Sequence, residues 1–213
     1  MVRMDIQVID FVFSAAILIM SVVIHEVSHG LVADAMGDPT ARYQGRLTLN
    51  PIKHLDPVGS VIVPALTFFL GGLIFGWAKP VPYNPYNLRN QKHGPAMVAA
   101  AGPLANLLVA TLFGLIIRFS VPLGIPKEFI QVSLMIVLIN TVLAVFNLAP
   151  IPPLDGSKIL FTFLPIRFFY IQRFLEQHGF FFIIIFIFFF WELISPLVSW
   201  LFRLITGIGF AGV

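Results

Sequence analysis

Five long apolar stretches constrain the fold of this chain more than any other feature. They cover residues 11–35, 57–78, 94–117, 129–154 and 179–202. A helix that crosses the hydrocarbon core of a bilayer needs about 20 apolar residues, so each stretch is long enough to cross once. Only 11% of the 213 residues are charged, whereas soluble domains carry about 25%. The sequence therefore predicts an all-α integral membrane protein, and argues against a soluble enzyme, a disordered chain or a nucleic-acid-binding protein.

The first apolar stretch contains the pattern H-E-x-x-H, formed by His25-Glu26-Val27-Ser28-His29. Residues four apart lie on one face of a helix, so both imidazoles can bind a single metal ion. Glu26 lies about 100° around the helix from His25, close enough to reach a water molecule at that metal. Ionisable residues within a membrane helix are costly and usually functional. We therefore expect a Zn²⁺ site, although a helix end whose polar residues face water is the alternative.

A catalytic zinc site takes three protein ligands, and Asp155 is the best candidate for the third. It follows the proline-rich run of residues 147–154 and precedes Gly156. The prolines remove amide donors and break the helix, so this backbone must be buried or line a cavity. A carboxylate presented by a broken membrane helix is typical of an ion or metal site. The alternative is that Asp155 caps the short helix expected to begin near Gly156.

Four stretches give the chain a resemblance to the site-2 protease family of intramembrane zinc metalloproteases. They are HEVSHGLVADAMGD (25–38), GRLTLNPIKHLD (45–56), GPLAN (102–106) and NLAPIPPLDG (147–156). The chain most resembles the small prokaryotic members that lack PDZ and CBS domains.

This resemblance implies one Zn²⁺ per chain, bound by His25, His29 and Asp155, with Glu26 as the general base. It implies hydrolysis of peptide bonds in or near the transmembrane segments of other membrane proteins, which would be the substrates. Asn106 and Asn147 match polar family positions near the site, where contacts to the substrate backbone or to an oxyanion are expected.

His54 lies in a loop motif, where an accessory zinc or substrate contact competes with hydrogen bonding to backbone groups. The Pro- and Asn-rich segment 79–93 should be extended or turn-like. It is suited either to pairing with an unwound substrate strand or to serving as a plain connection.

All three zinc ligands must lie at one depth in the membrane, which constrains the topology. The first and fourth apolar stretches must then run in one direction and the third in the other. Gly and Pro interrupt residues 57–78, so we expect this stretch to re-enter or to form a broken segment. About four full spans remain. Nine basic residues then fall on the face nearer the site and four on the other, which predicts a site nearer the cytoplasmic face of the cell membrane.

The expected organisation is a single polytopic membrane domain over residues 1–213, a multi-pass helical bundle with short extended loops. Its parts are a metal helix at 11–36, a loop and re-entrant region at 37–93, a core helix at 94–117, a core helix with the L-D-G segment at 129–164, and a C-terminal helix at 179–206. A membrane transporter or metal carrier that uses the same His/Asp site is the alternative function, because transporters also contain broken helices and intramembrane carboxylates. The absence of inverted-repeat symmetry and the position of Glu26 favour hydrolysis.

Overall fold

Three long apolar helices form the centre of the molecule. The structure, a computed structural model, describes residues 2–56, 58–62, 78–189 and 191–208. The described residues are mainly helical and contain no β-strand. The helices long and apolar enough to cross a membrane are residues 12–35 of α1 (Val2–Ala35), α4 (Gly94–Arg118) and α6 (Lys127–Asn147). The predicted all-helical architecture is thereby confirmed, with three helices among the described residues that are long and apolar enough to cross a membrane; the count of about four full spans stays a prediction.

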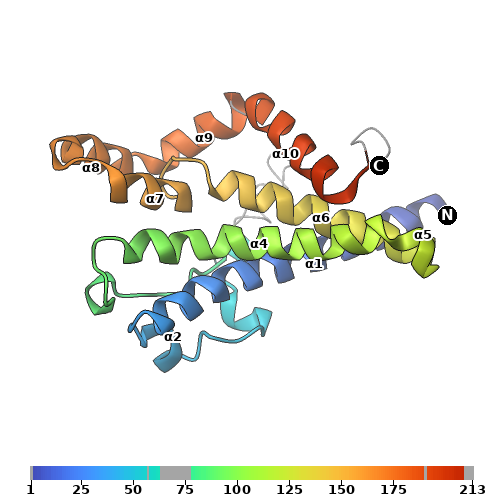
Figure 1. Cartoon of the computed structure of the whole chain (residues 1–213), viewed down its shortest axis with the longest axis horizontal. Coiled ribbons are helices and arrows are strands. Elements are labelled where there is room, and N and C mark those ends of the chain that lie inside the picture. The colour runs from blue at the N-terminus through green and yellow to red at the C-terminus, as the bar shows by residue number, and fades with distance from the viewer. Residues whose placement is uncertain (1, 57, 63–77, 190, 209–213) are drawn as a thin grey trace.

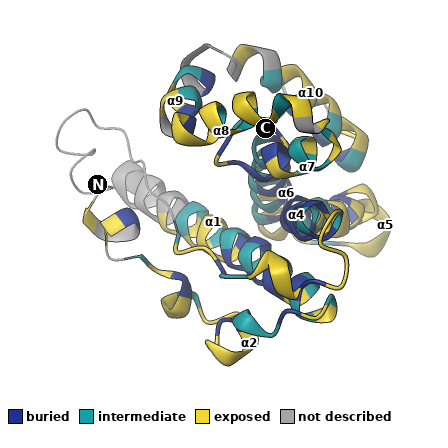
Figure 2. Cartoon of the chain, turned by 90° about the vertical axis from the view of Figure 1, so that its left-hand side faces the viewer, coloured by how far each residue is buried: buried dark blue, intermediate teal, exposed yellow. Residues whose placement is uncertain are grey.

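The three helices alternate in direction, as the depth of the site requires. α1 and α6 run the same way, and α4 runs opposite to both (Figure 1). α4 packs against α1 and α6, which brings the buried faces of all three together (Figure 2). Small residues on α4, such as Ala99, Gly102 and Ala110, are buried at these contacts, and such residues let membrane helices approach closely. The core residue Phe202 completes a cluster with Ala110, Ile117 and Val137.

The C-terminal region, where one helix is expected over residues 179–206, contains α9 (Gly179–Phe189) and α10 (Trp191–Thr206) on either side of residue 190, which lies outside the described residues. The two helices lean in different directions (Figure 1). Pro196 lies inside α10, where it cannot donate a hydrogen bond to the carbonyl of Glu192. This weakens the first turn of α10. α10 returns to pack against α4 and α6.

Polar loops and short helices connect the long helices at the end where α1 finishes. α2 (Thr40–Tyr43), η1 (Pro51–His54) and the π-helical turn η2 (Val58–Ile62) follow α1, and η3 (Pro85–Asn87) precedes α4. The re-entrant segment predicted over 57–78 falls largely on residues 57 and 63–77, which lie outside the described residues.

The chain folds back on itself after α6, and this return positions the L-D-G segment. α7 (Asp155–Phe163) begins after seven connecting residues, 148–154, and is followed by η4 (Ile166–Phe168) and α8 (Phe169–Gln177). Gly156 packs so closely on the end of α6 that a Cβ atom there would lie 2.1 Å from the carbonyl oxygen of Leu148. Only glycine fits at this contact.

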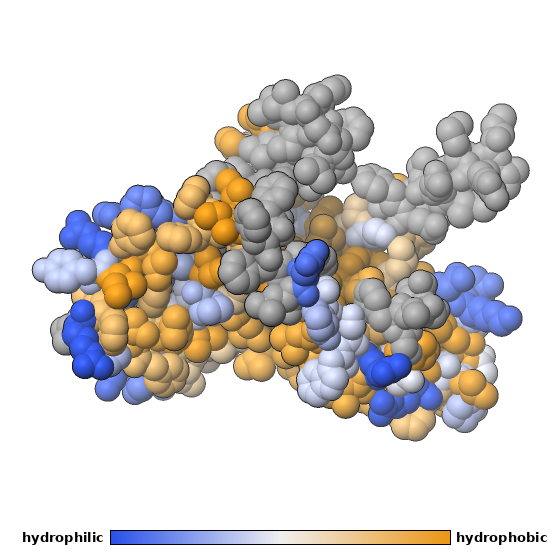
Figure 3. All heavy atoms as spheres, turned by 90° about the horizontal axis from the view of Figure 1, so that it is seen from above, coloured by the Kyte–Doolittle hydropathy of each residue, from blue (hydrophilic) through white to orange (hydrophobic). Residues whose placement is uncertain are grey.

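Hydrophobic residues cover much of the middle of the molecule, and hydrophilic residues gather mainly toward its two ends (Figure 3). This distribution suits a chain whose long axis crosses a bilayer.

Candidate active site

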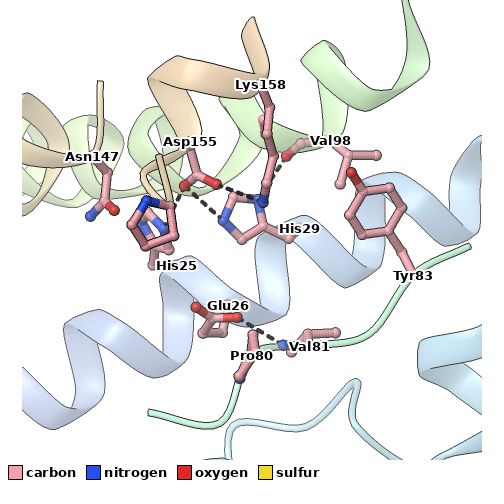
Figure 4. A pocket seen from close by; sticks show the side chains of 12 residues that line it. His25, Glu26, His29, Pro80, Val81, Tyr83, Val98, Asn147, Asp155 and Lys158 are labelled. Atoms are coloured by element: carbon pink, nitrogen blue, oxygen red, sulfur yellow. Dashed lines mark hydrogen bonds and ion pairs between the residues drawn. The ribbon is translucent and has the colours of Figure 1, made fainter. Parts of the chain in front are cut away.

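Three buried side chains from distant parts of the chain converge beside the bundle core. Nε2 of His25 and Nε2 of His29 each lie 3.1 Å from Oδ2 of Asp155. One donor atom from each residue lies within 4.8 Å of the others. Figure 4 shows both imidazoles, which come from α1, facing the carboxylate at the start of α7. All three residues are at most 9% exposed. The structure thus brings together the three side chains that the sequence predicted as ligands of one ion.

The local structure explains why Asp155 faces the imidazoles. Asp155 is the first residue of α7, and the N-cap position is occupied by Leu154 without a side-chain capping bond. The carboxylate instead contacts His25, His29 and, at 3.4 Å, the Nζ atom of Lys158. The capping role considered from the sequence is therefore not the one that the structure shows.

This donor set fits Zn²⁺ in chemistry and, for the two imidazole–carboxylate pairs, in spacing. Two imidazole nitrogens and one carboxylate oxygen form a ligand set typical of catalytic zinc sites. Tetrahedral ligands about 2.1 Å from zinc are themselves about 3.4 Å apart. The Nε2–Oδ2 separations of 3.1 Å are close to that value.

Hydrogen bonds on the far side of each imidazole orient the Nε2 atoms toward Asp155. Nδ1 of His29 lies 2.7 Å from the carbonyl oxygen of Val98, and Nδ1 of His25 lies 2.6 Å from Oδ1 of Asn106. These oxygens only accept hydrogen bonds, so both Nδ1 atoms donate, and in the neutral rings both Nε2 atoms keep a lone pair for a metal.

The two asparagines predicted near the site occupy different places. Asn147 lines the pocket, and its Nδ2 atom donates to the carbonyl of Leu143 at 2.9 Å. Asn106 is completely buried behind His25 and is not among the residues that line the pocket. A direct substrate contact is therefore open to Asn147, whereas Asn106 contacts a predicted ligand from behind.

A pocket of about 150 Å³ opens onto the three side chains. This volume holds several water molecules, each of which takes about 30 Å³ in the liquid. The lining combines the His/Asp cluster with residues from the loop before α4 and from the L-D-G segment: His25, Glu26, His29, Pro80, Val81, Tyr83, Val98, Ala99, Asn147, Pro153, Asp155 and Lys158.

The carboxylate of Glu26 is held in this pocket by the main chain. Oε2 of Glu26 accepts a hydrogen bond of 2.8 Å from the backbone N–H of Val81 (Figure 4). Val81 belongs to an extended segment, residues 79–84, which we call the strap. Three strap residues, Pro80, Val81 and Tyr83, line the pocket.

Buried polar side chains outside the pocket anchor both ends of the strap. Nη2 of Arg46 donates to the carbonyls of Lys79 and Pro80, at 2.7 and 3.3 Å. At the other end, Asp38 accepts a 2.6 Å hydrogen bond from the N–H of Asn84. These hydrogen bonds at both ends therefore hold the strap in place, with the N–H of Val81 directed at Glu26.

His54 belongs to the framework behind the strap. The residue is 1% exposed, and its Nε2 atom lies 2.9 Å from the carbonyl oxygen of Thr48. Its own carbonyl accepts a hydrogen bond from the N–H of Lys79, also at 2.9 Å. His54 does not line the pocket, so its position matches the loop-supporting alternative.

The hydrogen bonds that Asp38 accepts in this framework also shift the pKa of its carboxyl group. Burial raises the pKa of Asp38, but hydrogen bonds from Thr40, Asn87 and Asn84 outweigh that effect and hold the pKa below its usual value. Sequence reasoning assigned no role to Asp38 or Arg46, although both lie in the stretches that carry the family resemblance. Their position as ionisable residues just beyond a membrane helix was the available signal.

Comparisons with known proteins agree with this site. The model of Peptidase family M50 matches residues 124–189, which include Asp155. YwhC of Bacillus subtilis, provisionally named a zinc metalloprotease, is 39% identical over 158 residues, covering 70% of this chain and 67% of its own. Rip2 of Mycolicibacterium smegmatis and Rip2 of Mycobacterium tuberculosis H37Rv, named in the same way, are 35% and 31% identical, each with 70% of this chain and 56% of the relative covered.

This chain thus spans between about half and two thirds of the length of these curated relatives. No solved structure matches it. The match to YwhC extends over most of the chain, and the M50 match includes the predicted third ligand. The resemblance read from the sequence is confirmed: the chain belongs to peptidase family M50, the site-2 protease family.

Proposed function

We propose that this chain is a zinc metalloendopeptidase that hydrolyses peptide bonds in or near the transmembrane segments of other membrane proteins. The observation that carries the proposal is the convergence of His25, His29 and Asp155 on one point, with Glu26 in the same pocket. Membership of family M50 and the names of the relatives support it.

The depth of the site supports action within the membrane. His25 lies ten residues before the end of α1 at Ala35, which corresponds to about 15 Å at a rise of 1.5 Å per residue. At this depth a substrate helix has all its backbone groups hydrogen-bonded internally. The substrate must therefore unwind locally before a peptide carbonyl can enter the pocket.

The residues of the pocket divide the chemistry between them. His25, His29 and Asp155 would hold a zinc ion, which when bound supplies Lewis acidity toward a carbonyl and lowers the pKa of water. Glu26 would take a proton from the attacking water and later return it to the leaving amine nitrogen. The N–H of Val81 fixes the carboxylate of Glu26 during these transfers.

Asn147 and the strap are placed to contact the substrate backbone. Asn147 donates one amide hydrogen to the carbonyl of Leu143. Its second amide hydrogen could then donate to a substrate carbonyl or a developing oxyanion, and its oxygen could accept from a substrate N–H. Pro80, Val81 and Tyr83 form the opposite wall, along which an unwound segment would lie (Figure 4).

The site belongs to the half of the bundle that we assign to the cytoplasmic side of the cell membrane. α2, α7 and α8 lie at the same end of the molecule (Figure 1), and the residues around them carry most of the basic side chains. Basic residues favour the cytoplasmic side of membrane proteins. The chain would then form one polytopic domain with a single zinc ion.

Hydrolysis accounts for the site better than metal transport does. A carrier needs only the ligands, whereas this pocket also holds Glu26 beside them, with its carboxylate oriented by a backbone N–H. Membership of a peptidase family points the same way.

The decisive experiment is co-expression with a panel of single-span membrane proteins. Glu26→Gln removes the base but keeps an oxygen that can accept from Val81, so the strap should stay in place. We expect cleavage by the wild type and a loss of at least 100-fold in the variant, while zinc stays at one per chain. The control Glu176→Gln makes the same change on the exposed helix α8 and should cleave normally. Full cleavage by Glu26→Gln, or zinc flux into proteoliposomes without any cleavage, would contradict the proposal.

The orientation can be tested separately, because the chain contains no cysteine. Single cysteines at exposed Arg173 and Lys127 would lie on opposite sides of the membrane. A membrane-impermeant thiol reagent added to intact cells should label Lys127→Cys and not Arg173→Cys. The reverse pattern would place the site toward the outer face.

A further inference from the structure

A chain of buried hydrogen bonds runs behind His25 through all three long helices. It joins His25 and Ser21 on α1, Asn106 on α4 and Asn140 on α6. These four residues are at most 6% exposed. Unpaired polar groups are costly at membrane depth, so a connected set in this place calls for an explanation.

Two backbone carbonyls fix the orientation of both amide groups. Nδ2 of Asn140 donates to the carbonyl of Ile136 at 2.9 Å, and Nδ2 of Asn106 donates to the carbonyl of Ser21 at 3.2 Å. A carbonyl cannot donate, so neither amide can be flipped without losing its bond. Oδ1 of Asn140 therefore faces Asn106 and accepts its second N–H at 2.8 Å.

Both N–H hydrogens of each amide group are used. The second N–H of Asn140 donates to Oγ of Ser21 at 2.9 Å. With both of its hydrogens committed to Ser21 and Asn140, Asn106 can offer only its oxygen to Nδ1 of His25, at 2.6 Å. The hydrogen bonds that link His25, Asn106, Asn140 and Ser21 thus all run in one donor-to-acceptor direction, and the imidazole of His25 lies at one end of this network.

This donor-to-acceptor direction determines which ring nitrogen of His25 carries the hydrogen and which carries the lone pair. An oxygen 2.6 Å from Nδ1 accepts the hydrogen of Nδ1, so in the neutral ring the lone pair is on Nε2, the nitrogen that faces Asp155. His29 obtains the same result from the backbone carbonyl of Val98, which no side-chain substitution removes. Only the His25 side of the site depends on side chains of other helices.

We propose that Asn140 and Ser21, through Asn106, are positioning residues that set the tautomer and ring orientation of His25 and thereby the zinc affinity of the site. This inference rests on the proposed zinc site. Asn140 touches neither the pocket nor His25, so its effect must pass through the amide of Asn106.

The test is the zinc dissociation constant of the purified full chain, measured by chelator competition in detergent. Asn106→Leu should weaken zinc binding by about 10- to 100-fold. Asn140→Leu should weaken it less, by about tenfold, and the double variant should bind no more weakly than Asn106→Leu alone. Residues that act through one another give non-additive effects, whereas independent losses of packing add. The control Thr141→Val removes a buried hydroxyl that bonds only to its own helix, and should leave the affinity unchanged.

Ser21→Ala gives a milder test that keeps both amide groups. It removes only the hydroxyl that accepts from Asn140, and should weaken zinc binding by about threefold. Unchanged affinity in Asn140→Leu and Ser21→Ala, or additive effects in the double variant, would show a merely structural network and overturn the inference. A wild-type chain that binds no zinc would instead overturn the metal centre itself, so the two failures are distinct.

Discussion

Gly102 of α4 lies against His29 of α1 so closely that a Cβ atom at Gly102 would be 2.5 Å from Nε2 of His29. The same atom would be 2.6 Å from Nε2 of His25. The missing side chain therefore leaves room for the two nitrogens that face Asp155. The structure thus places Gly102 directly against both imidazoles of the candidate metal centre.

Gly102→Ala should therefore expel or displace the metal without unfolding the chain. Alanine favours helix by about 1 kcal/mol over glycine, so lost binding would not reflect a weaker helix. We expect zinc affinity to fall at least tenfold, measured by chelator competition. Leu104→Met, a change of similar size at an exposed position on the same helix, should bind as the wild type does. Normal affinity in Gly102→Ala would mean that the imidazoles do not hold the metal where the structure places them.

The contact between Val81 and Glu26 gives a prediction about catalysis alone. Val81→Pro removes the N–H that holds the carboxylate, and the site before Pro82 already favours the extended backbone that proline accepts. We expect cleavage to slow by about tenfold or more because the base loses its orientation, with zinc content unchanged. Val81→Ala keeps the N–H and should cleave nearly normally. Equal rates in the two variants would remove this hydrogen bond from the mechanism.

The sequence predicted the parts of this fold that depend on local hydropathy and spacing. Residues 94–117 correspond closely to α4, because apolar length is itself what a membrane selects. The convergence of His25 and His29 with Asp155 was also predicted, since helical spacing fixes the pair and a shared depth requires the third residue.

Contacts between distant loops could not be predicted in the same way. Arg46 and Asp38 brace the strap through backbone groups more than 30 positions away, and no periodicity reveals such partners. Asn106 was expected near the site, but its place behind His25 depends on how α1 and α4 pack.

Asp38 should make stability depend on pH at the acid end. A carboxyl group whose pKa is lowered by folding stabilises the folded state above its unfolded pKa, about 3.9, and loses that contribution as pH falls through its folded pKa. Asp38→Asn offers one acceptor oxygen in place of two, and should cost about 1–3 kcal/mol near pH 7.

Thermal unfolding in detergent from pH 7 to pH 2 tests this. The difference between wild type and Asp38→Asn should stay constant above about pH 5 and shrink below about pH 4. Asp34→Asn, which alters an ion pair with exposed Arg42, serves as a control and should change stability by less than about 1 kcal/mol. A constant difference down to pH 2 would mean that the Asp38 carboxylate is not stabilised by its hydrogen bonds.

Removing the metal should destabilise the wild type by an amount that depends on free zinc. A ligand present at 100 times its dissociation constant stabilises the folded state by about 2.7 kcal/mol, which corresponds to about 5–10 °C in a chain of this size. Chelator should therefore lower the unfolding temperature of the wild type in detergent. Asp155→Ala lacks one of the three converging donors and should show little response to the same chelator. Asp34→Ala removes a carboxylate from the same end of α1 outside the cluster and should respond as the wild type does. If Asp155→Ala responds fully, the carboxylate is not a ligand, because the metal would then be held without it.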